Sequence, residues 1–314
     1  NQLVAKTSPS ASCFLPNKQS VRHLMKDSGV PYSIAGEQIV LVGAAAEEVS
    51  KRCAVKTEHL LARNPLRKDQ QTIAEPLNEL IASLVPSASV PGDVCSLGLL
   101  ADELHADWLR AVVVSRGYQV VDCSAGLAVI LAELVRENFT GIGIVFGASR
   151  CEAVLAREGV EIARYELPRG GEAIDQSIAI SEDRYWWSMS GFRELETESI
   201  TQWKEALGTS VLEPSNPRSE RLLNGYHQLV IELCTACETH FPQSELPDQL
   251  AVVACGGATR IPGFADLLNQ HLSDSSLPIA QEKTRIESGE YTVSRGLLIH
   301  AELQQRSHAQ SKAA

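Results

Sequence analysis

A glycine pair directly after an apolar run is the most informative chemical feature of the sequence. The run Ala251–Cys255 is followed by Gly256 and Gly257, and then by the segment Ala258–Pro262. Glycines between a buried strand and a helix let the backbone approach a flat ligand closely, and the first N–H groups of the helix can bind an anion. A glycine pair alone is weak evidence, but the complete run V-V-x-x-G-G-x-T-R-I-P predicts a ligand-binding turn.

Eight cysteines are the second group of potentially reactive side chains. They lie in apolar segments and do not frame short loops, at positions 13, 53, 95, 123, 151, 234, 237 and 255. This distribution is typical of a cytosolic chain with reduced thiols. Cys234, Cys237 and His240 resemble half of a metal site. The sequence has no second C-x-x-C, and the spacing fits one face of a helix, so we interpret both cysteines as buried small hydrophobes.

The composition excludes several classes of function. The chain has 314 residues, 44% of them hydrophobic, and its 28 Lys and Arg against 39 Asp and Glu give a net charge of −11. This acidic excess opposes binding to nucleic-acid phosphates. The apolar runs Gly141–Phe146 and Leu250–Cys255 are far shorter than the roughly 20 residues of a membrane-spanning helix. We expect a cytoplasmic protein of two compact lobes, with no nucleic-acid partner and no integral membrane segment.

Alternating strand and helix patterns along the chain predict an α/β fold. Strands are expected at 38–43, 94–99, 118–122, 140–146, 153–156, 161–166 and 251–255. Helices are expected at 44–53, 72–84, 101–116, 124–136, from near 172, and at 218–240, 263–272 and 291–304. The turn at Arg157–Gly159 predicts a hairpin. Residues 1–30 are expected to contain one or two short strands at most, and residues 183–208 to be helical in parts.

From about residue 30 onward, the chain resembles the ATPase superfamily of actin, hexokinase and the heat-shock chaperones, above all the seventy-kilodalton chaperones and the bacterial actin MreB. The run from Ala251 to Phe264 resembles the adenosine-binding segment of this superfamily, and Gly141–Gly159 resembles its second phosphate loop. Gly170–Asp175 is similar to the element G-G-[DE]-x-[FM]-D, and Lys204 falls where MreB has an adenosine-side lysine. Further motifs of the family are matched at 42–46, 118–131 and 292–296.

The resemblance implies a two-lobed, actin-like (ribonuclease-H-like) ATPase fold with minimal insertions. Residues 1–139 and 276–314 would form the first lobe, with an incomplete N-terminal hairpin, and residues 140–275 the second. It also implies ATP or ADP as ligand, and protein partners or self-association. The implied cofactor-binding residues are Gly147, Ser149, Gly171, Glu172, Lys204, Gly256, Gly257, Ala258 and Arg260.

Three departures from the family pattern concern the phosphate and metal side of the site. Val145 occupies the position of the aspartate that holds Mg²⁺ through water, and a valine cannot ligate a cation that requires oxygen donors. Ala148 and Ser149 replace two of the three loop glycines. Cys123 replaces the Glu or Gln that helps to position the attacking water. Cys123 is then either a nucleophile or a buried thiol, and Arg150 either lies near a phosphate or faces solvent on its turn.

The first phosphate loop of the family, D-x-G-[ST], does not occur in the sequence, which begins at Asn1. This start is either a truncation edge or an evolutionary loss. Two hypotheses follow. In the first, the chain is a degenerate member that binds nucleotide weakly, holds Mg²⁺ poorly, has no catalytic residue and acts by binding or scaffolding. In the second, it is a working ATPase whose first loop lies upstream. A sugar or metabolite kinase is a third reading, but no acid/base pair of carboxylates supports it.

Overall fold

The computed structural model describes residues 4–53, 55, 57–59, 70–98, 103–187, 193–287, 289 and 291–313. The chain forms two compact units. The first consists of Asn1–Asp93 and Asp107–Gln119, and the second of Val94–Ala106 and Val120–Ala314. These two units differ from the two lobes expected from the sequence. The units are defined by compactness alone, whereas the expected lobes are the two sides of a nucleotide-binding fold. The lobe boundaries after residues 139 and 275 therefore stay a prediction.

The first unit is built on a four-stranded antiparallel sheet with the order β2-β3-β1-β4. Its strands are β1 (Ala11–Pro16), β2 (Ser33–Ala35), β3 (Gln38–Val42) and β4 (Glu58–His59). The same unit contains three helices, which are α1 (Gln19–Asp27), α2 (Gly43–Cys53) and α3 (Gln70–Leu84). The two central strands carry the core, in which Cys13 pairs with Leu41 and α2 packs on β1 through Ala46 and Val49.

The second unit contains a five-stranded sheet with the order β13-β12-β7-β8-β9. Its strands are β7 (Gly141–Phe146), β8 (Cys151–Arg157), β9 (Val160–Leu167), β12 (Leu250–Cys255) and β13 (Ile279–Glu287). β12 runs parallel to β7 and β13, whereas β7, β8 and β9 form an antiparallel meander. All residues of β7 and β12 are buried, as expected for strands covered on both faces.

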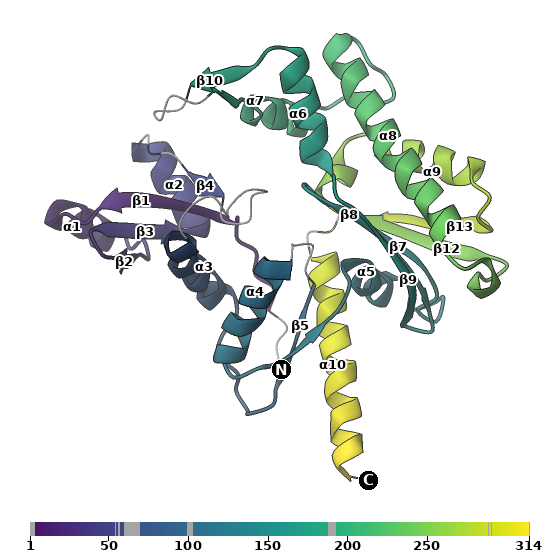
Figure 1. Ribbon diagram of the computed structural model, residues 1–314, viewed down its shortest axis with the longest axis horizontal. Helices are drawn as coiled ribbons and strands as arrows, with labels where there is room; N and C mark the ends of the chain where they lie inside the picture. The colour runs from purple at the N-terminus through teal and green to yellow at the C-terminus, as the bar shows by residue number, and fades with distance from the viewer. Residues whose placement is uncertain are drawn as a thin grey trace. The chain divides into compact units, whose positions relative to one another are not determined.

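Helices cover both faces of this sheet (Figure 1). The helices of the second unit are α5 (Ala125–Glu133), α6 (Gly171–Ser181), α7 (Glu198–Glu205), α8 (Pro217–His240), α9 (Phe264–Asp274) and α10 (Thr292–Ala313), while α4 (Glu103–Ser115) has residues in both units. Two small sheets complete the fold, β5 (Val94–Leu97) with β6 (Gln119–Asp122), and β10 (Tyr185–Trp187) with β11 (Arg193–Leu195). The 3₁₀ turns are η2 (Gln243–Glu245) and η3 (Gly257–Arg260).

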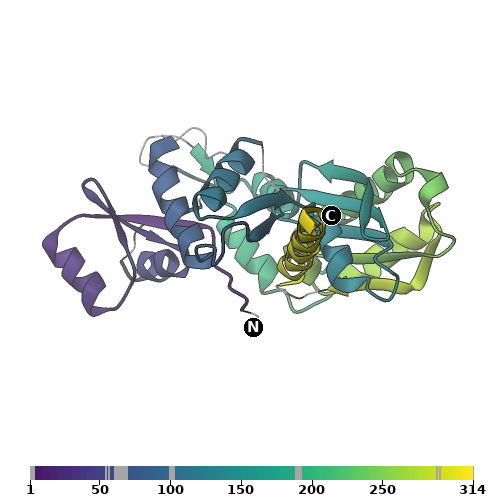
Figure 2. The same cartoon turned by 90° about the horizontal axis from the view of Figure 1, so that it is seen from below.

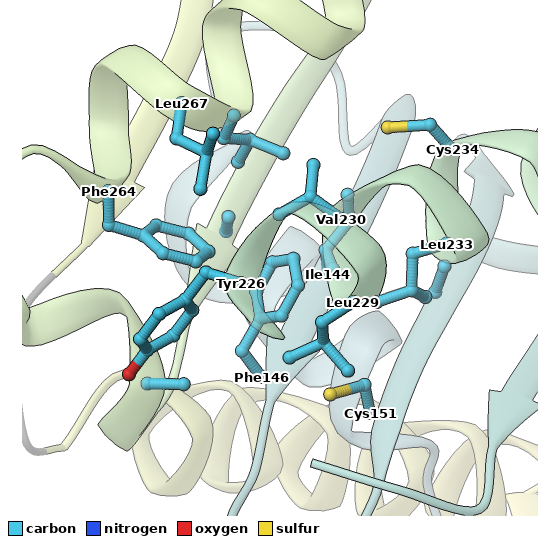
Figure 3. Packing of buried hydrophobic residues seen from close by; sticks show 14 of the residues in the cluster. Ile144, Phe146, Cys151, Tyr226, Leu229, Val230, Leu233, Cys234, Phe264 and Leu267 are labelled. Carbon is cyan, nitrogen blue, oxygen red and sulfur yellow. The ribbon is translucent and has the colours of Figure 1, made fainter. Parts of the chain in front are cut away.

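The larger core lies between the sheet and the helices α8 and α9. Phe264 packs edge-to-face on Phe146, with ring centroids 4.9 Å apart, and on Tyr226, at 5.7 Å (Figure 3). The smaller core lies on the opposite face, where α5 packs on the sheet and α10 packs on α5. Figure 2 views α10, in yellow, nearly along its axis. These two layers fix the strand ends of β7 and β12, which carry the candidate site.

Most elements lie where the sequence predicts them, but the short strands β2 and β4 were not predicted, and three further segments differ. Residues 19–27 form α1, and residues 279–287 form β13, neither of which the sequence analysis predicted. β13 has the sequence I-A-Q-E-K-T-R-I-E, which lacks an apolar run. Its parallel pairing with β12 makes it a strand, and such pairing is not a local property. The segment 183–208 contains the β10–β11 hairpin before the short helix α7.

Candidate functional site

The carboxyl ends of β7 and β12 lie side by side, because the two strands are parallel and Val145 pairs with Cys255. The loops that follow them, beginning at Gly147 and Gly256, therefore leave the same edge of the sheet. Ligands of α/β proteins bind outside the carboxyl ends of parallel strands. Gly256 has φ = 117°, and a β-carbon at this position would lie 2.3 Å from the carbonyl oxygen of Phe146. Only glycine fits this close approach of the two loops.

The loop after β7 is attached to the start of α6. The backbone N–H groups of Gly171 and Glu172 donate to the carbonyl oxygens of Gly147 (3.0 Å) and Ala148 (2.8 Å). A β-carbon on Gly170 would lie 2.3 Å from the Gly147 oxygen, so this junction also requires glycine. The two N–H groups are engaged by the protein's own loop. The beginning of α6 thus positions the loop, and its dipole still favours an anion nearby.

A buried ion pair lies next to the start of α6, where the loop after β7 is attached. Lys204 Nζ of α7 lies 2.5 Å from Asp175 Oδ1 of α6 and donates to the Gly171 carbonyl oxygen at 3.4 Å. The Thr201 hydroxyl donates to the second carboxylate oxygen of Asp175 at 2.8 Å. Only 13% of the Lys204 side chain and 4% of the Asp175 side chain are exposed. The sequence predicts Asp175 only as part of the element Gly170–Asp175, and the structure shows that its carboxylate orients Lys204.

Three of the predicted site residues meet at Gly171. A β-carbon built on Gly171 would lie 3.7 Å from Lys204 Nζ and 3.9 Å from Ala258 Cβ. The same position lies 3.9 Å from the Gly147 carbonyl oxygen. Residues from the loop after β7, from α7 and from the turn after β12 therefore converge on the first residue of α6.

The turn after β12 is closed by its own hydrogen bonds. Both the backbone N–H (3.2 Å) and the hydroxyl (2.9 Å) of Thr259 donate to the carbonyl oxygen of Gly256. Gly257 is exposed, and no heavy atom lies within 4 Å of its β-carbon position. Ala258 is buried, whereas Arg260 is exposed. The turn thus presents open backbone at Gly257, with an apolar wall at Ala258 and a cation at Arg260.

The remaining predicted residues, Ser149 and Glu172, are both half-buried beside the junction. Gly147 N–H donates to the carbonyl oxygen of Arg150 at 3.0 Å, which closes the loop around Ser149. Arg150 Nη1 lies 3.7 Å from Glu166 Oε2 in β9. The guanidinium of Arg150 is therefore within ion-pair distance of β9 and is partly exposed, and both alternatives that the sequence leaves open for Arg150 stay predictions.

Two of the positions that depart from the family pattern, Val145 and Cys123, are buried. Val145 belongs to the apolar cluster between the sheet and α5. Cys123 lies in the same cluster, and burial, followed by the charges of Glu161 and Glu152, raises its pKa to about 12. A thiol with this pKa is protonated near neutral pH and is a poor nucleophile. The geometry therefore favours the interpretation of Cys123 as a buried thiol.

Glu152 is a functional candidate that the sequence analysis used only as an alignment point. Its side chain is fully buried, and Oε1 accepts a hydrogen bond from the backbone N–H of Gly126 at 2.6 Å. Oε2 has no hydrogen-bond partner among the described residues. Burial raises the pKa of Glu152 to about 7, against the opposing effect of the Gly126 hydrogen bond. A single acid within the apolar strand C-E-A-V-L-A was the available signal.

The residues of this region fit one half of a nucleotide better than the other. Open backbone at Gly257, the apolar Ala258 and the lysine beside Gly171 are suited to a flat, polar-edged ligand. The metal side does not fit, because Val145 offers no oxygen where a carboxylate would be needed. Within the described ranges, no group of three or more His, Cys, Asp and Glu residues could hold a metal ion.

Solved structures define the class of protein. MreB 5 of Spiroplasma citri bound to AMPPNP is similar with a TM-score of 0.63 and 13% identity, over 97% of this chain and 91% of that chain. The MamK double helical filament is similar with a TM-score of 0.63 and 15% identity, over 93% and 91% of the two chains. These similarities confirm the predicted α/β, two-lobed actin-like fold.

A family model identifies the chain more specifically than the solved structures do. The family model described as volactin matches residues 1–301, and the chain therefore belongs to the volactin family. No curated protein matches it. Among the helices that the structure describes, none has the length and apolarity needed to cross a membrane.

Proposed function

We propose that this member of the volactin family binds ATP or ADP at the carboxyl edge of β7 and β12 and acts by binding and self-assembly, with slow hydrolysis or none. The observation that carries the proposal is the convergence of Gly147, Lys204 and Ala258, from three separate segments of the chain, on Gly171 at the start of α6. Such convergence of backbone, one apolar wall and one buried cation is typical of a preformed small-molecule site.

The nucleoside half is assigned to the turn after β12 and to α7. Gly256, Gly257 and Ala258 would let the base lie flat against backbone, because no side chain projects from the first two positions. Lys204 is held by Asp175 and would donate to oxygen atoms of the ligand from a fixed position. Glu172 and Arg260 lie at the margin of this region and would contact its polar groups.

The phosphate half is assigned to Gly147 and Ser149, whose loop is closed by the Arg150 carbonyl oxygen. Phosphoryl transfer depends on metal-bound phosphates and on a positioned water. Val145 and Cys123, both buried in an apolar cluster, supply neither function. We therefore infer weak retention of Mg²⁺ and a slow chemical step.

Two properties of similar proteins support the proposal. MreB 5 of Spiroplasma citri has been solved with AMPPNP and with ADP, and MamK as a double helical filament. Self-association of this chain is the corresponding proposal for its partner. The eight free cysteines support a cytoplasmic location, where thiols stay reduced.

The proposal is tested by titrating the protein with ATP and ADP in a calorimeter, with and without Mg²⁺, and by measuring phosphate release. We expect binding that is nearly independent of Mg²⁺, and little phosphate release. Gly257→Val should abolish binding, since its side chain would fill the open backbone position. Gly208→Ala is the control for a methyl group added to a glycine, because no heavy atom lies within 4 Å of that β-carbon position.

Two results would overturn the proposal in different ways. Absence of binding heat for both nucleotides would remove nucleotide binding altogether. Binding that requires Mg²⁺ and is followed by turnover would replace the degenerate reading by that of a working ATPase.

A further inference from the structure

The nucleotide site proposed above assigns no role to Glu152, although this residue is a fully buried acid on the strand that follows the phosphate loop. Oε1 accepts a hydrogen bond from the backbone N–H of Gly126 at 2.6 Å, whereas Oε2 has no hydrogen-bond partner among the described residues. A buried carboxylate is costly unless it is paired and hydrogen-bonded, and here only one of its two oxygens is satisfied. The neutral acid is the form that this environment tolerates best.

The arginines nearest to Glu152 are engaged by other carboxylates. In β9, Arg164 Nε lies 3.6 Å from Glu161 Oε1, and Arg164 Nη1 lies 3.6 Å from Glu166 Oε1. Arg150 Nη1 lies 3.7 Å from Glu166 Oε2. Two arginines thus balance the two partly exposed glutamates of β9. Among the described residues, neither arginine lies within ion-pair distance of the buried acid Glu152.

The segment before α5 adds no positive charge beside Glu152. Burial, followed by the charges of Glu161 and Glu152, raises the pKa of the Cys123 thiol to about 12, so this thiol stays protonated and neutral. The Ser124 hydroxyl donates to Glu161. Burial also raises the pKa of Glu152 to about 7, against the hydrogen bond from Gly126. The carboxyl group of Glu152 therefore changes its charge near neutral pH.

Glu152 is close to the loop that is assigned to the phosphates. The Gly147 N–H donates to the Arg150 carbonyl oxygen at 3.0 Å and closes this loop, and Glu152 is the second residue after it. Three residues separate Ser149 from Glu152, so their α-carbons are at most about 11 Å apart. Charges interact over such distances more strongly through protein than through water. A polyphosphate at this loop would therefore disfavour the charged form of Glu152.

We propose that Glu152 couples nucleotide binding to proton uptake. Above neutral pH its carboxylate is charged in the free protein, and it takes up one proton from the solvent when a di- or triphosphate binds at the Gly147–Ser149 loop. The O–H bond forms at the carboxylate, and no other bond forms or breaks. The proposal rests on the proposed nucleotide site and adds a regulatory property to it.

The sign of the pH dependence follows from this coupling. Below pH 7 the carboxyl group is neutral in the free and in the bound protein, so Glu152 adds no pH dependence. The phosphate charge raises the pKa of Glu152 further in the complex. Nucleotide affinity therefore falls as pH rises from 7 through the pKa of the bound state, because binding then requires a proton that is increasingly scarce.

The test is calorimetric titration of the intact chain and of Glu152→Gln with ADP, without Mg²⁺, at pH 6.5 and pH 8.5. Gln keeps an acceptor for the Gly126 N–H and is neutral at both pH values. We expect the affinity of the intact chain to fall by about fivefold more than that of the variant. Glu302→Gln, at an exposed position in α10, is the control variant and should behave as the intact chain does. Adenosine is the control ligand, because it carries no phosphate.

A second measurement counts the proton directly and needs no variant. Titration of the intact chain with ADP at pH 8 is repeated in two buffers with different ionisation enthalpies, and the difference in heat gives the number of protons taken up. The phosphates of free ADP are already ionised at this pH, since the second pKa of a phosphate group is about 6. We expect uptake of a substantial fraction of one proton with ADP and none with adenosine.

Proton uptake with ADP that is lost in Glu152→Gln supports the proposal. Binding of ADP without proton uptake, equal uptake in the variant, or equal uptake with adenosine overturns it and leaves the proposed nucleotide site standing. Absence of binding for ADP and adenosine in both proteins overturns the proposed function and, with it, the coupling.

Discussion

Gly296 in α10 packs directly on the backbone of Ala128 in α5. A β-carbon built on Gly296 would lie 1.7 Å from the Ala128 carbonyl oxygen and 2.4 Å from its carbonyl carbon. Because α5 in turn packs on β7 and β12, this helix crossing supports the sheet from which the candidate site projects.

Gly296→Ala should destabilise the protein, because the added methyl group meets backbone that cannot move aside. We expect a loss of about 3 kcal/mol or more in the free energy of unfolding, at the upper end of overpacking. Urea denaturation followed by circular dichroism measures it. Gly208→Ala, with open space at its β-carbon position, should instead be neutral or stabilising by a few tenths of a kcal/mol. Equal stability of the two variants would contradict the packing argument.

Breaking the Lys204–Asp175 pair should be costly, since it leaves a buried carboxylate without its cation. Lys204→Met is expected to lower the free energy of unfolding by about 3 kcal/mol, and Asp175→Asn by a similar amount. The double variant should cost less than the sum of the two single changes. The exposed pair Arg306–Glu302 is the control, and its Arg306→Met variant should cost under about 1 kcal/mol. Additive effects at Lys204 and Asp175 would show that the pair is not coupled.

Glu152→Gln should stabilise the protein at alkaline pH. The folded-state pKa of Glu152 is raised from 4.5 to about 7, so the folded state binds the proton more tightly than the unfolded state. The destabilising effect of Glu152 is absent below pH 4.5, grows as pH rises to 7 and is complete above it. From 1.36 kcal/mol per pKa unit, the gain at pH 8 is at most about 3 kcal/mol.

Denaturation curves at pH 5 and pH 8 measure this gain. Glu302→Gln, at an exposed position in α10, should leave the difference between the two pH values unchanged. A Glu152→Gln variant with the pH dependence of the wild type would disprove the raised pKa.

The cap of α8 should contribute measurably to stability. The Asn216 side chain accepts hydrogen bonds from the backbone N–H groups of Arg218 and Ser219, both at 3.0 Å, while the Ser219 hydroxyl accepts from the Asn216 N–H. Asn216→Ala should cost about 1 kcal/mol, and Asn216→Asp, which keeps the acceptor, should cost little. Chemical denaturation measures the free energy of unfolding of both variants. An equal loss of stability in the two would show that the side-chain hydrogen bonds of Asn216 do not stabilise α8.

The chain's own pattern was sufficient for most elements of the fold. The buried runs at Gly141–Phe146 and Leu250–Cys255 predicted β7 and β12, and the turn at Arg157–Gly159 predicted the β8–β9 hairpin. Apolar periodicity and glycine spacing are local properties, and they are readable in one sequence. The same local motifs placed Gly147 and Gly256 after strands and Gly171 beside the start of a helix.

Other features depended on partners far away in the chain. β13 is a strand because β12 lies beside it, and Lys204 is fixed because Asp175, 29 residues earlier, lies 2.5 Å away. The raised pKa of Glu152 comes from burial, against the effect of the Gly126 hydrogen bond from α5, and the apolar strand around Glu152 shows in the sequence only that an acid is present there. Local patterns in the sequence are sufficient for most elements and for the glycine turns of this chain. The burial of charges and the meeting of distant residues depend on tertiary packing, because desolvation and close approach arise between segments far apart in the sequence.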